Sequence, residues 1–150
     1  MTQIKKVEST GILLVEDDPN DVELIQLALE NYNFVNDIHI AHDGEEAIQY
    51  LMGCEGEPST QPLPRMILLD LKLPKVNGIQ VLEAIRSHPR TKNLVVVVMT
   101  SSAENQDLQA CYALGVNSYI VKPLDFQQFV EVCRKVGFYW MLLNQQPIDT

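Results

Sequence analysis

The sequence predicts an α/β fold in which helices cover both faces of one parallel β-sheet. Short apolar runs alternate five times with stretches of helical periodicity, which is the pattern of strands joined by crossover helices. Three of the runs lack polar alternation, as expected for strands that are covered on both faces. The 150 residues are 46% hydrophobic and 21% charged, a composition typical of a folded domain rather than a disordered chain.

The expected strands coincide with the apolar runs. They cover residues 12–15, 38–41, 66–69, 94–99 and 118–121. Their alternation with helices predicts a doubly wound parallel sheet. We expect five strands in the flavodoxin-like order 2-1-3-4-5, with five helices. Ligands of such sheets bind beyond the carboxyl ends of the strands, so the residues that follow each run are informative about function.

The first three helices are marked by their ends. Asp18 is a candidate cap for the first helix, which has a proline in its first turn. The second covers residues 45–52 and starts near Asp43. Apolar residues over 79–85 indicate the third, which must end before Pro89 because proline disfavours helical geometry in the residue ahead of it.

The last two helices follow the fourth and fifth strands. Apolar residues over 108–114 indicate one helix, which Gly115 closes in the usual C-terminal position. The other begins near Asp125 and runs toward Leu143. Between the second helix and the third strand, residues 53–64 hold two glycines and three prolines, so we expect a long loop that projects from the edge.

We expect one domain over residues 11–143, with polar, flexible tails at residues 1–10 and 144–150. Twenty acidic residues against eleven basic ones give a formal charge of −9, which disfavours direct binding to nucleic acids and to anionic membrane surfaces. The longest apolar run is too short to span a membrane, and the chain starts without the apolar stretch of a signal peptide. A cytoplasmic location is therefore expected.

Charged and hydroxyl side chains follow four of the five expected strands, and the topology brings them to one edge of the sheet. They are Glu16, Asp17 and Asp18 after the first strand, Asp70 after the third, Thr100 and Ser101 after the fourth, and Lys122 after the fifth. Asp18 by itself is better explained as a helix cap, and a lone threonine or lysine at the start of a loop is commonly solvated. Their occurrence together indicates a functional site.

Crowded carboxylates repel one another unless a cation neutralises them, which favours a bound divalent ion. Magnesium suits this site because it prefers oxygen ligands and keeps several waters. We expect Asp17 and Asp70 to be direct ligands, Glu16 to act through water, and the backbone carbonyl of Lys72 to supply a further ligand.

The remaining groups suit a phosphoryl group on Asp70. Thr100 offers a hydroxyl donor and Lys122 a positive charge, and a carboxylate can be the nucleophile in phosphoryl transfer. The small side chain of Ser101 would leave the approach to Asp70 open. We therefore expect Asp70 to be the phosphoacceptor.

At these residues the sequence resembles the receiver domains of two-component response regulators, over roughly residues 11–136. The motifs that carry the resemblance are ILLVEDDP (12–19), LLDLKLPKVNG (68–78), VVVMTSS (96–102) and YIVKP (119–123).

The resemblance implies that a histidine kinase phosphorylates Asp70, and that a cis peptide bond precedes Pro123. The other roles that it implies are an acidic pair for magnesium at Glu16 and Asp17, a switch hydroxyl at Thr100, a charged group at Lys122 and an aromatic switch at Tyr119.

Within that family, the LDLKLPK wording, the long loop before the third strand and the aromatic C-terminal helix are similar to small regulators that partner cyanobacterial phytochromes. This similarity implies a receiver without an output domain and a phytochrome histidine kinase as phosphodonor. It also implies a homodimer formed through the face of the fourth and fifth helices.

The apolar end of the last helix favours a homodimer independently of the resemblance. These residues lie beyond the point where one helix needs to cover its sheet, and such an apolar excess often marks a partner surface. The alternative is that the segment folds back on its own core. The interface candidates are Phe138, Tyr139, Trp140 and Leu143.

The sequence leaves two rival functions open beside a signalling switch that is not an enzyme. One is a magnesium-dependent hydrolase of the haloacid dehalogenase type, although that family wants an aspartate where this chain has Lys72. The other is a dimerisation module that works without phosphorylation. For the switch, neither Lys72 nor Ser102 is suited to orient an attacking water, so we expect slow self-dephosphorylation.

Overall fold

The computed structural model describes residues 11–30 and 38–144, so nearly all of both predicted tails lies outside the described residues. The main sheet is parallel throughout, in the order β2-β1-β5-β6-β7. Its strands are β1 (Ile12–Val15), β2 (Ile38–Ala41), β5 (Met66–Leu69), β6 (Val95–Thr100) and β7 (Ser118–Val121). The predicted order 2-1-3-4-5 is confirmed, because β3 and β4 belong to a separate small sheet.

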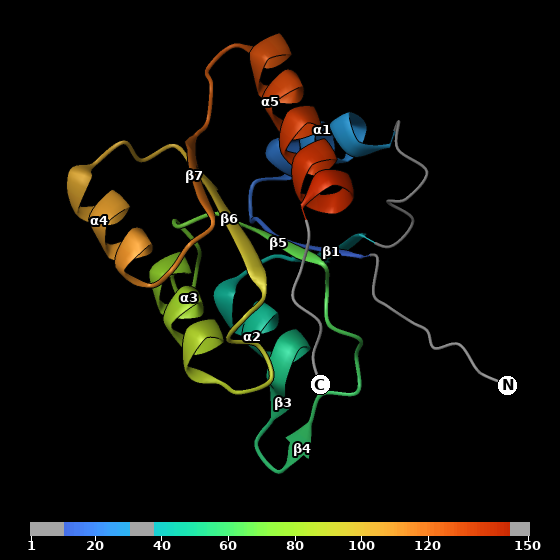
Figure 1. Ribbon diagram of the computed structural model, residues 1–150, viewed down its shortest axis with the longest axis vertical. Coiled ribbons are helices and arrows are strands. Elements are labelled where there is room, and N and C mark those ends of the chain that lie inside the picture. Colours follow the sequence, from blue (N-terminus) through green and yellow to red (C-terminus); the bar gives the residue numbers. More distant parts are fainter. Residues whose placement is uncertain (1–10, 31–37, 145–150) are drawn as a thin grey trace, which may run out of the picture.

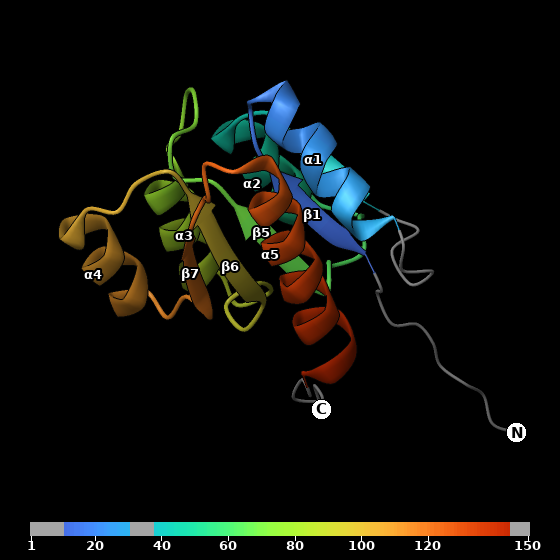
Figure 2. The ribbon, with the colours of Figure 1, turned by 90° about the horizontal axis from the view of Figure 1, so that it is seen from above.

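Helices lie on both faces of the sheet (Figures 1 and 2). α1 and α5 pack side by side on one face, whereas α2 and α3 cover the other and α4 lies beside α3 near the β7 edge. The helices are α1 (Pro19–Leu29), α2 (Gly44–Met52), α3 (Gly78–Ser87), α4 (Asn105–Ala113) and α5 (Phe126–Phe138). This is the doubly wound arrangement that the alternating apolar runs predict.

The core consists of two layers, one on each face of the sheet. Leu14 points into the layer beneath α1 and α5, while its neighbours Leu13 and Val15 point into the layer beneath α2 and α3. Every residue of β1, β5 and β6 is buried, which explains why these strands show no polar alternation. The layers fix the strand ends, and therefore the residues that follow them.

Short polar side chains start most of the helices, as the sequence predicts. Asp18, Asp43 and Asp125 each accept a hydrogen bond from a backbone N–H in the first turn of the following helix. Asn77 caps α3 in a reciprocal capping box with Gln80. Asp18 is thus a helix cap.

The predicted loop over residues 53–64 is not wholly irregular. It contains a two-stranded antiparallel hairpin, β3 (Gly53–Cys54) and β4 (Glu57–Pro58), which Gly53 opens with a φ of +87°. The guanidinium group of Arg90 donates to the carbonyl oxygens of Leu51 (2.9 Å) and Gln61 (2.6 Å) and so fixes both ends of the segment. Composition marked the turn residues, but it could not reveal this distant tether.

The last helix extends as far as predicted, but its end is wound differently. α5 passes into a π-helical turn, Tyr139–Leu143, and the N–H of Asn144 bonds to the carbonyl of Tyr139. Within residues 11–30 and 38–144, no helix has the length and apolar character needed to cross a membrane.

Candidate functional site

Three carboxylates meet where β1 and β5 end. Glu16 follows β1 and Asp70 follows β5, and the two strands pair in register up to Val15 and Leu69. Glu16, Asp17 and Asp70 can each place one carboxylate oxygen within 4.8 Å of those of the other two. Glu16 and Asp70 are buried whereas Asp17 is exposed, so the cluster opens to solvent on one side.

The backbone after β5 holds the Asp70 carboxylate. Its Oδ1 accepts a hydrogen bond from the N–H of Leu71 (2.7 Å) and a longer one from the N–H of Lys72 (3.5 Å). The start of α3 packs directly on this turn, since a Cβ at Gly78 would overlap the carbonyl oxygen of Asp70 and the Cα of Leu71. Glycine at position 78 therefore allows α3 to support the site at close range.

The ammonium group of Lys122 lies among carboxylates that come from three elements. Its Nζ is 2.7 Å from Asp21, 2.9 Å from Glu16 and 3.1 Å from Asp70. The backbone N–H of Lys122 donates to the carbonyl of Thr100 (2.7 Å), which holds the start of the β7–α5 loop against β6.

Asp21, in the first turn of α1, is the member of this group that our sequence analysis missed. The usable signal was its position in the first turn of the helix that starts at Pro19, which is the turn nearest the carboxyl edge of the sheet.

The electrostatics of the cluster reflect burial and like charge. Burial and the nearby charge of Asp70 raise the pKa of Glu16 from its ordinary value of 4.5 to about 7, against the opposing effect of Lys122. Burial by itself would lower the pKa of Lys122, but hydrogen bonds to Asp21 and Glu16 outweigh it, and the net shift is upward. The carboxylates thus hold the lysine charged, while the lysine does not offset the effect of burial on the pKa of Glu16.

The two predicted switch residues, Thr100 and Tyr119, meet at Ser102. The N–H of Ser102 donates to Oγ1 of the fully buried Thr100 (3.3 Å), and the hydroxyl of Tyr119 donates to the carbonyl of Ser102 (2.9 Å). The Ser102 hydroxyl donates in turn to Asp107 of α4 (2.6 Å). Ser102 therefore links the end of β6 to both β7 and α4, a role that sequence reasoning did not assign.

The other predicted residues lie around the opening of the cluster. Lys72 is exposed and lines an open hollow of about 440 Å³ together with Asp17 and Asp107. Ser101 is exposed at the end of β6. The peptide bond before Pro123 is trans, the intrinsically preferred isomer, so the cis bond implied by the resemblance is wrong.

The apolar end of α5 divides between core and surface. Trp140 is half-buried against the layer beneath α1 and α5, and Met141 is buried in it, so part of the segment folds back as the alternative proposed. Phe138, Tyr139 and Leu143 are 42%, 48% and 54% exposed.

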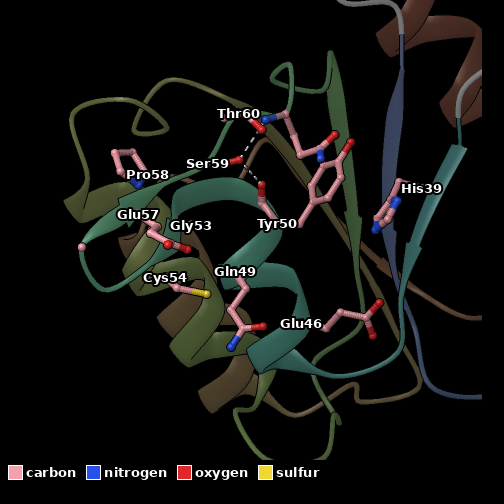
Figure 3. Close-up of a pocket in the computed structure, with 12 residues that line it drawn as sticks. His39, Glu46, Gln49, Tyr50, Gly53, Cys54, Glu57, Pro58, Ser59 and Thr60 are labelled. Carbon is pink, nitrogen blue, oxygen red and sulfur yellow. Dashed lines mark hydrogen bonds between the residues drawn. The ribbon is translucent and has the colours of Figure 1, made fainter.

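A broad hollow of about 730 Å³ lies between β2, α2 and the β3–β4 hairpin (Figure 3). His39 and Tyr50 stack there with their ring centroids 4.0 Å apart. The hollow is lined by none of the predicted site residues, so its size does not identify the functional site.

At the carboxyl edge, by contrast, the donor set suits a small hard cation. Oxygen ligands from Glu16, Asp17 and Asp70 on an open face leave room for waters and a phosphate oxygen, as magnesium-type ions require. Among the residues that the structure describes, no other three acidic, histidine or cysteine side chains gather this closely.

The match to known proteins gives the family of this chain. Residues 12–134 match the family described as response regulator receiver domain. The chain belongs to this family. The resemblance seen in the four motifs is confirmed, and the family is one of phosphoacceptor signalling domains.

Relatives match over nearly the whole chain. The probable methanogenesis regulatory protein FilR2 of Methanothrix harundinacea is 41% identical over 136 residues, which are 91% of this chain and 86% of that protein. Response regulator Rcp1 of Synechocystis is 36% identical over 130 residues, 87% of this chain and 88% of that protein.

Solved structures agree with the fold. The phosphorylated cyanobacterial phytochrome response regulator RcpA superposes with a TM-score of 0.86 at 35% identity. The superposition covers 94% of this chain and 100% of RcpA.

Because its pKa is raised in the folded protein, Glu16 makes metal-free stability depend on pH. Between pH 4.5 and about 7 the folded chain keeps a proton that the unfolded chain has lost, so this contribution is full at low pH and disappears as the pH rises. We expect urea unfolding in EDTA to show a loss of at most about 3 kcal/mol across this range, and Glu16→Gln to remove that loss. Equal pH profiles of the free energy of unfolding for wild type and Glu16→Gln would contradict this expectation.

Proposed function

We propose that this chain is a response regulator that accepts a phosphoryl group from a histidine kinase on Asp70 and works as a phosphorylation-controlled switch. The observation that carries the proposal is the position of the Asp70 carboxylate. It lies between the Lys122 ammonium group (3.1 Å) and the Glu16 and Asp17 carboxylates, at the open carboxyl edge of the sheet. This arrangement offers a nucleophile with positive charge beside it and a place for a cation.

The chemistry is transfer of a phosphoryl group between two side chains. An oxygen of Asp70 attacks phosphorus as the bond to the kinase histidine nitrogen breaks, and the bonding electrons return to that imidazole. Leu71 and Lys72 orient the carboxylate through their N–H groups, and Lys122 stabilises charge on the phosphoryl oxygens. Thr100 would donate its hydroxyl to one of these oxygens.

Magnesium is the metal that we propose for the acidic cluster. Asp17 and Asp70 would hold it directly, Glu16 through water, and the carbonyl of Lys72 would complete the protein ligands. Bound there, it would neutralise the carboxylates and the incoming phosphoryl oxygens. The support is the set of oxygen ligands and the solved Mn²⁺-bound form of Rcp1, which is 33% identical with a TM-score of 0.81 and matches over 92% of this chain and 99% of that one.

The switch would pass through Ser102. If the hydroxyl of Thr100 turns toward a phosphoryl group, its bond to the N–H of Ser102 is lost, and the carbonyl that holds Tyr119 is free to shift. The Ser102 hydroxyl carries the same change to Asp107 of α4. The face of α4, β7 and α5 would then change its affinity for partners.

A phytochrome-type kinase in the cytoplasm is the phosphodonor that we propose. The similarity to RcpA and Rcp1 supports this choice, since the former is a phytochrome response regulator. Because the chain is also similar to FilR2, a histidine kinase that is not a phytochrome is the second phosphodonor to compare.

The test of the function is to follow the label from autophosphorylated kinases. We expect wild type and the helix-cap variant Asp125→Asn to be labelled in magnesium, and Asp70→Asn or added EDTA to leave only background, because each removes the acceptor or the cation. A phytochrome kinase should label faster than an unrelated kinase. Label on Asp70→Asn, or none on wild type even from acetyl phosphate, would refute the proposal. Turnover of a generic phosphate monoester that depends on Asp70 would favour the hydrolase.

We also propose a homodimer, formed through the face of α4 and α5 with the apolar end of the last helix, residues 138–143. Phe138, Tyr139 and Leu143 expose their side chains on consecutive turns, beside the half-buried Trp140. Burial of such a patch is a common driving force for association.

Sedimentation at tens of micromolar tests the dimer. We expect a dimer for wild type and for Leu27→Ser, which changes a side chain of comparable exposure (45%) on α1. The double variant Tyr139→Ser/Leu143→Ser should sediment as a monomer. A monomeric wild type in both phosphorylation states would end this proposal.

The phosphoryl group should be lost slowly, because Lys72 carries no water-orienting group and the Ser102 hydroxyl is bonded to Asp107. We expect purified labelled protein to keep its label for minutes or longer. Lys72→Asn, which supplies an amide, should shorten that time. The control is Lys75→Asn, in the same loop at a φ of +68° that asparagine tolerates. Loss from wild type within seconds would contradict the expectation.

A further inference from the structure

The ammonium group of Lys122 is already saturated with carboxylate partners. An ammonium group has three N–H donors. Three carboxylates take them, and the shortest contact, 2.7 Å, is the one to Asp21 rather than those to Glu16 (2.9 Å) or Asp70 (3.1 Å). Lys122 can therefore contact a phosphoryl oxygen only if it gives up one of these partners.

Asp70 is the partner that it would release. Its contact is the longest of the three, and its carboxylate loses its negative charge when it becomes an acyl phosphate. Asp21 and Glu16 are chemically unchanged in that state. Lys122 would then divide its positive charge between the phosphoryl group and two carboxylates, of which Asp21 makes the shorter contact.

The charges around the site show the effect of Asp21. Glu16, Asp17 and Asp70 carry three negative charges when ionised, which Lys122 and one divalent cation would balance. Asp21 adds a fourth negative charge in direct contact with the lysine. With all four carboxylates ionised, the site is one charge more negative than balance requires, which favours a cation and disfavours an incoming anion.

We propose that Asp21 is a positioning residue that restrains Lys122 and so limits the affinity of the site for the phosphoryl group. It holds the ammonium group on the α1 side and competes for its charge, while it strengthens metal binding. This inference rests on the proposed function, because it concerns phosphorylation of Asp70. Its distinctive consequence is that removal of the Asp21 charge changes cation binding and anion binding in opposite directions.

The experiment compares wild type, Asp21→Asn and Asp18→Asn by calorimetry. Each protein is titrated with magnesium, and then with beryllofluoride, a phosphoryl mimic, at saturating magnesium. Asp18→Asn is the matched control: it removes a charge from the same end of α1, asparagine caps a helix equally well, and Asp18 lies outside the group that contacts Lys122. We expect Asp21→Asn to bind beryllofluoride about three- to tenfold more tightly and magnesium more weakly by a similar factor. Asp18→Asn should change each by less than about twofold, because the charge of the exposed Asp18 side chain is screened by water and salt.

The outcomes separate this inference from the function on which it rests. If wild type binds beryllofluoride but Asp21→Asn binds it equally or more weakly, or if both variants shift alike, Asp21 has no such role. If wild type binds none, the proposed function fails and the inference fails with it.

A metal-free readout tests the contact itself. In EDTA, the effects of Asp21→Asn and Lys122→Met on the free energy of unfolding should be non-additive, since each removes the other's partner. Additive effects would also overturn the inference.

Discussion

The site depends on the balance between crowded carboxylates and the one ammonium group placed among them. Glu16, Asp21 and Asp70 all contact Lys122, and none of these side chains is more than 20% exposed. Burial of so many like charges is unfavourable, and it raises the pKa of Glu16 to about 7. The folded chain tolerates this because the sheet core fixes the strand ends on which the charges lie. Because the site carries an excess of negative charge, it favours binding of a cation that neutralises the carboxylates.

The same core connects this charge balance to the surface. The register of β5, β6 and β7 places Asp70 directly after β5, Thr100 at the end of β6 and Lys122 directly after β7, so they converge without long loops. Beyond them, Ser102 joins the end of β6 to Tyr119 and to α4 through hydrogen bonds of 2.6 to 3.3 Å. The core is rigid where the chemistry needs fixed positions. The β6–α4 loop is held by the individual hydrogen bonds of Ser102. A change at Asp70 can therefore be transmitted through this loop.

The sequence was sufficient to predict the features of the fold that depend on local pattern. Buried strands such as β1 and β5 were located to the residue, because each is an apolar run of strand length bounded by polar residues or glycine. The site residues at strand ends followed from topology. Asp21 and the linking role of Ser102 were missed, because they depend on which side chains meet across elements far apart in the chain. The hairpin at Gly53 was missed for a related reason, since its tether, Arg90, lies on a different segment.

The measurement that tests the account most directly is a crystal structure of the protein grown with Mn²⁺ and beryllofluoride, with the metal located by anomalous scattering. The account predicts one metal peak bounded by oxygens of Asp17 and Asp70, a beryllofluoride group on Asp70, and the Lys122 ammonium group turned from Asp70 to a fluorine. A metal bound elsewhere, or an unmodified Asp70 still paired with Lys122, would contradict it.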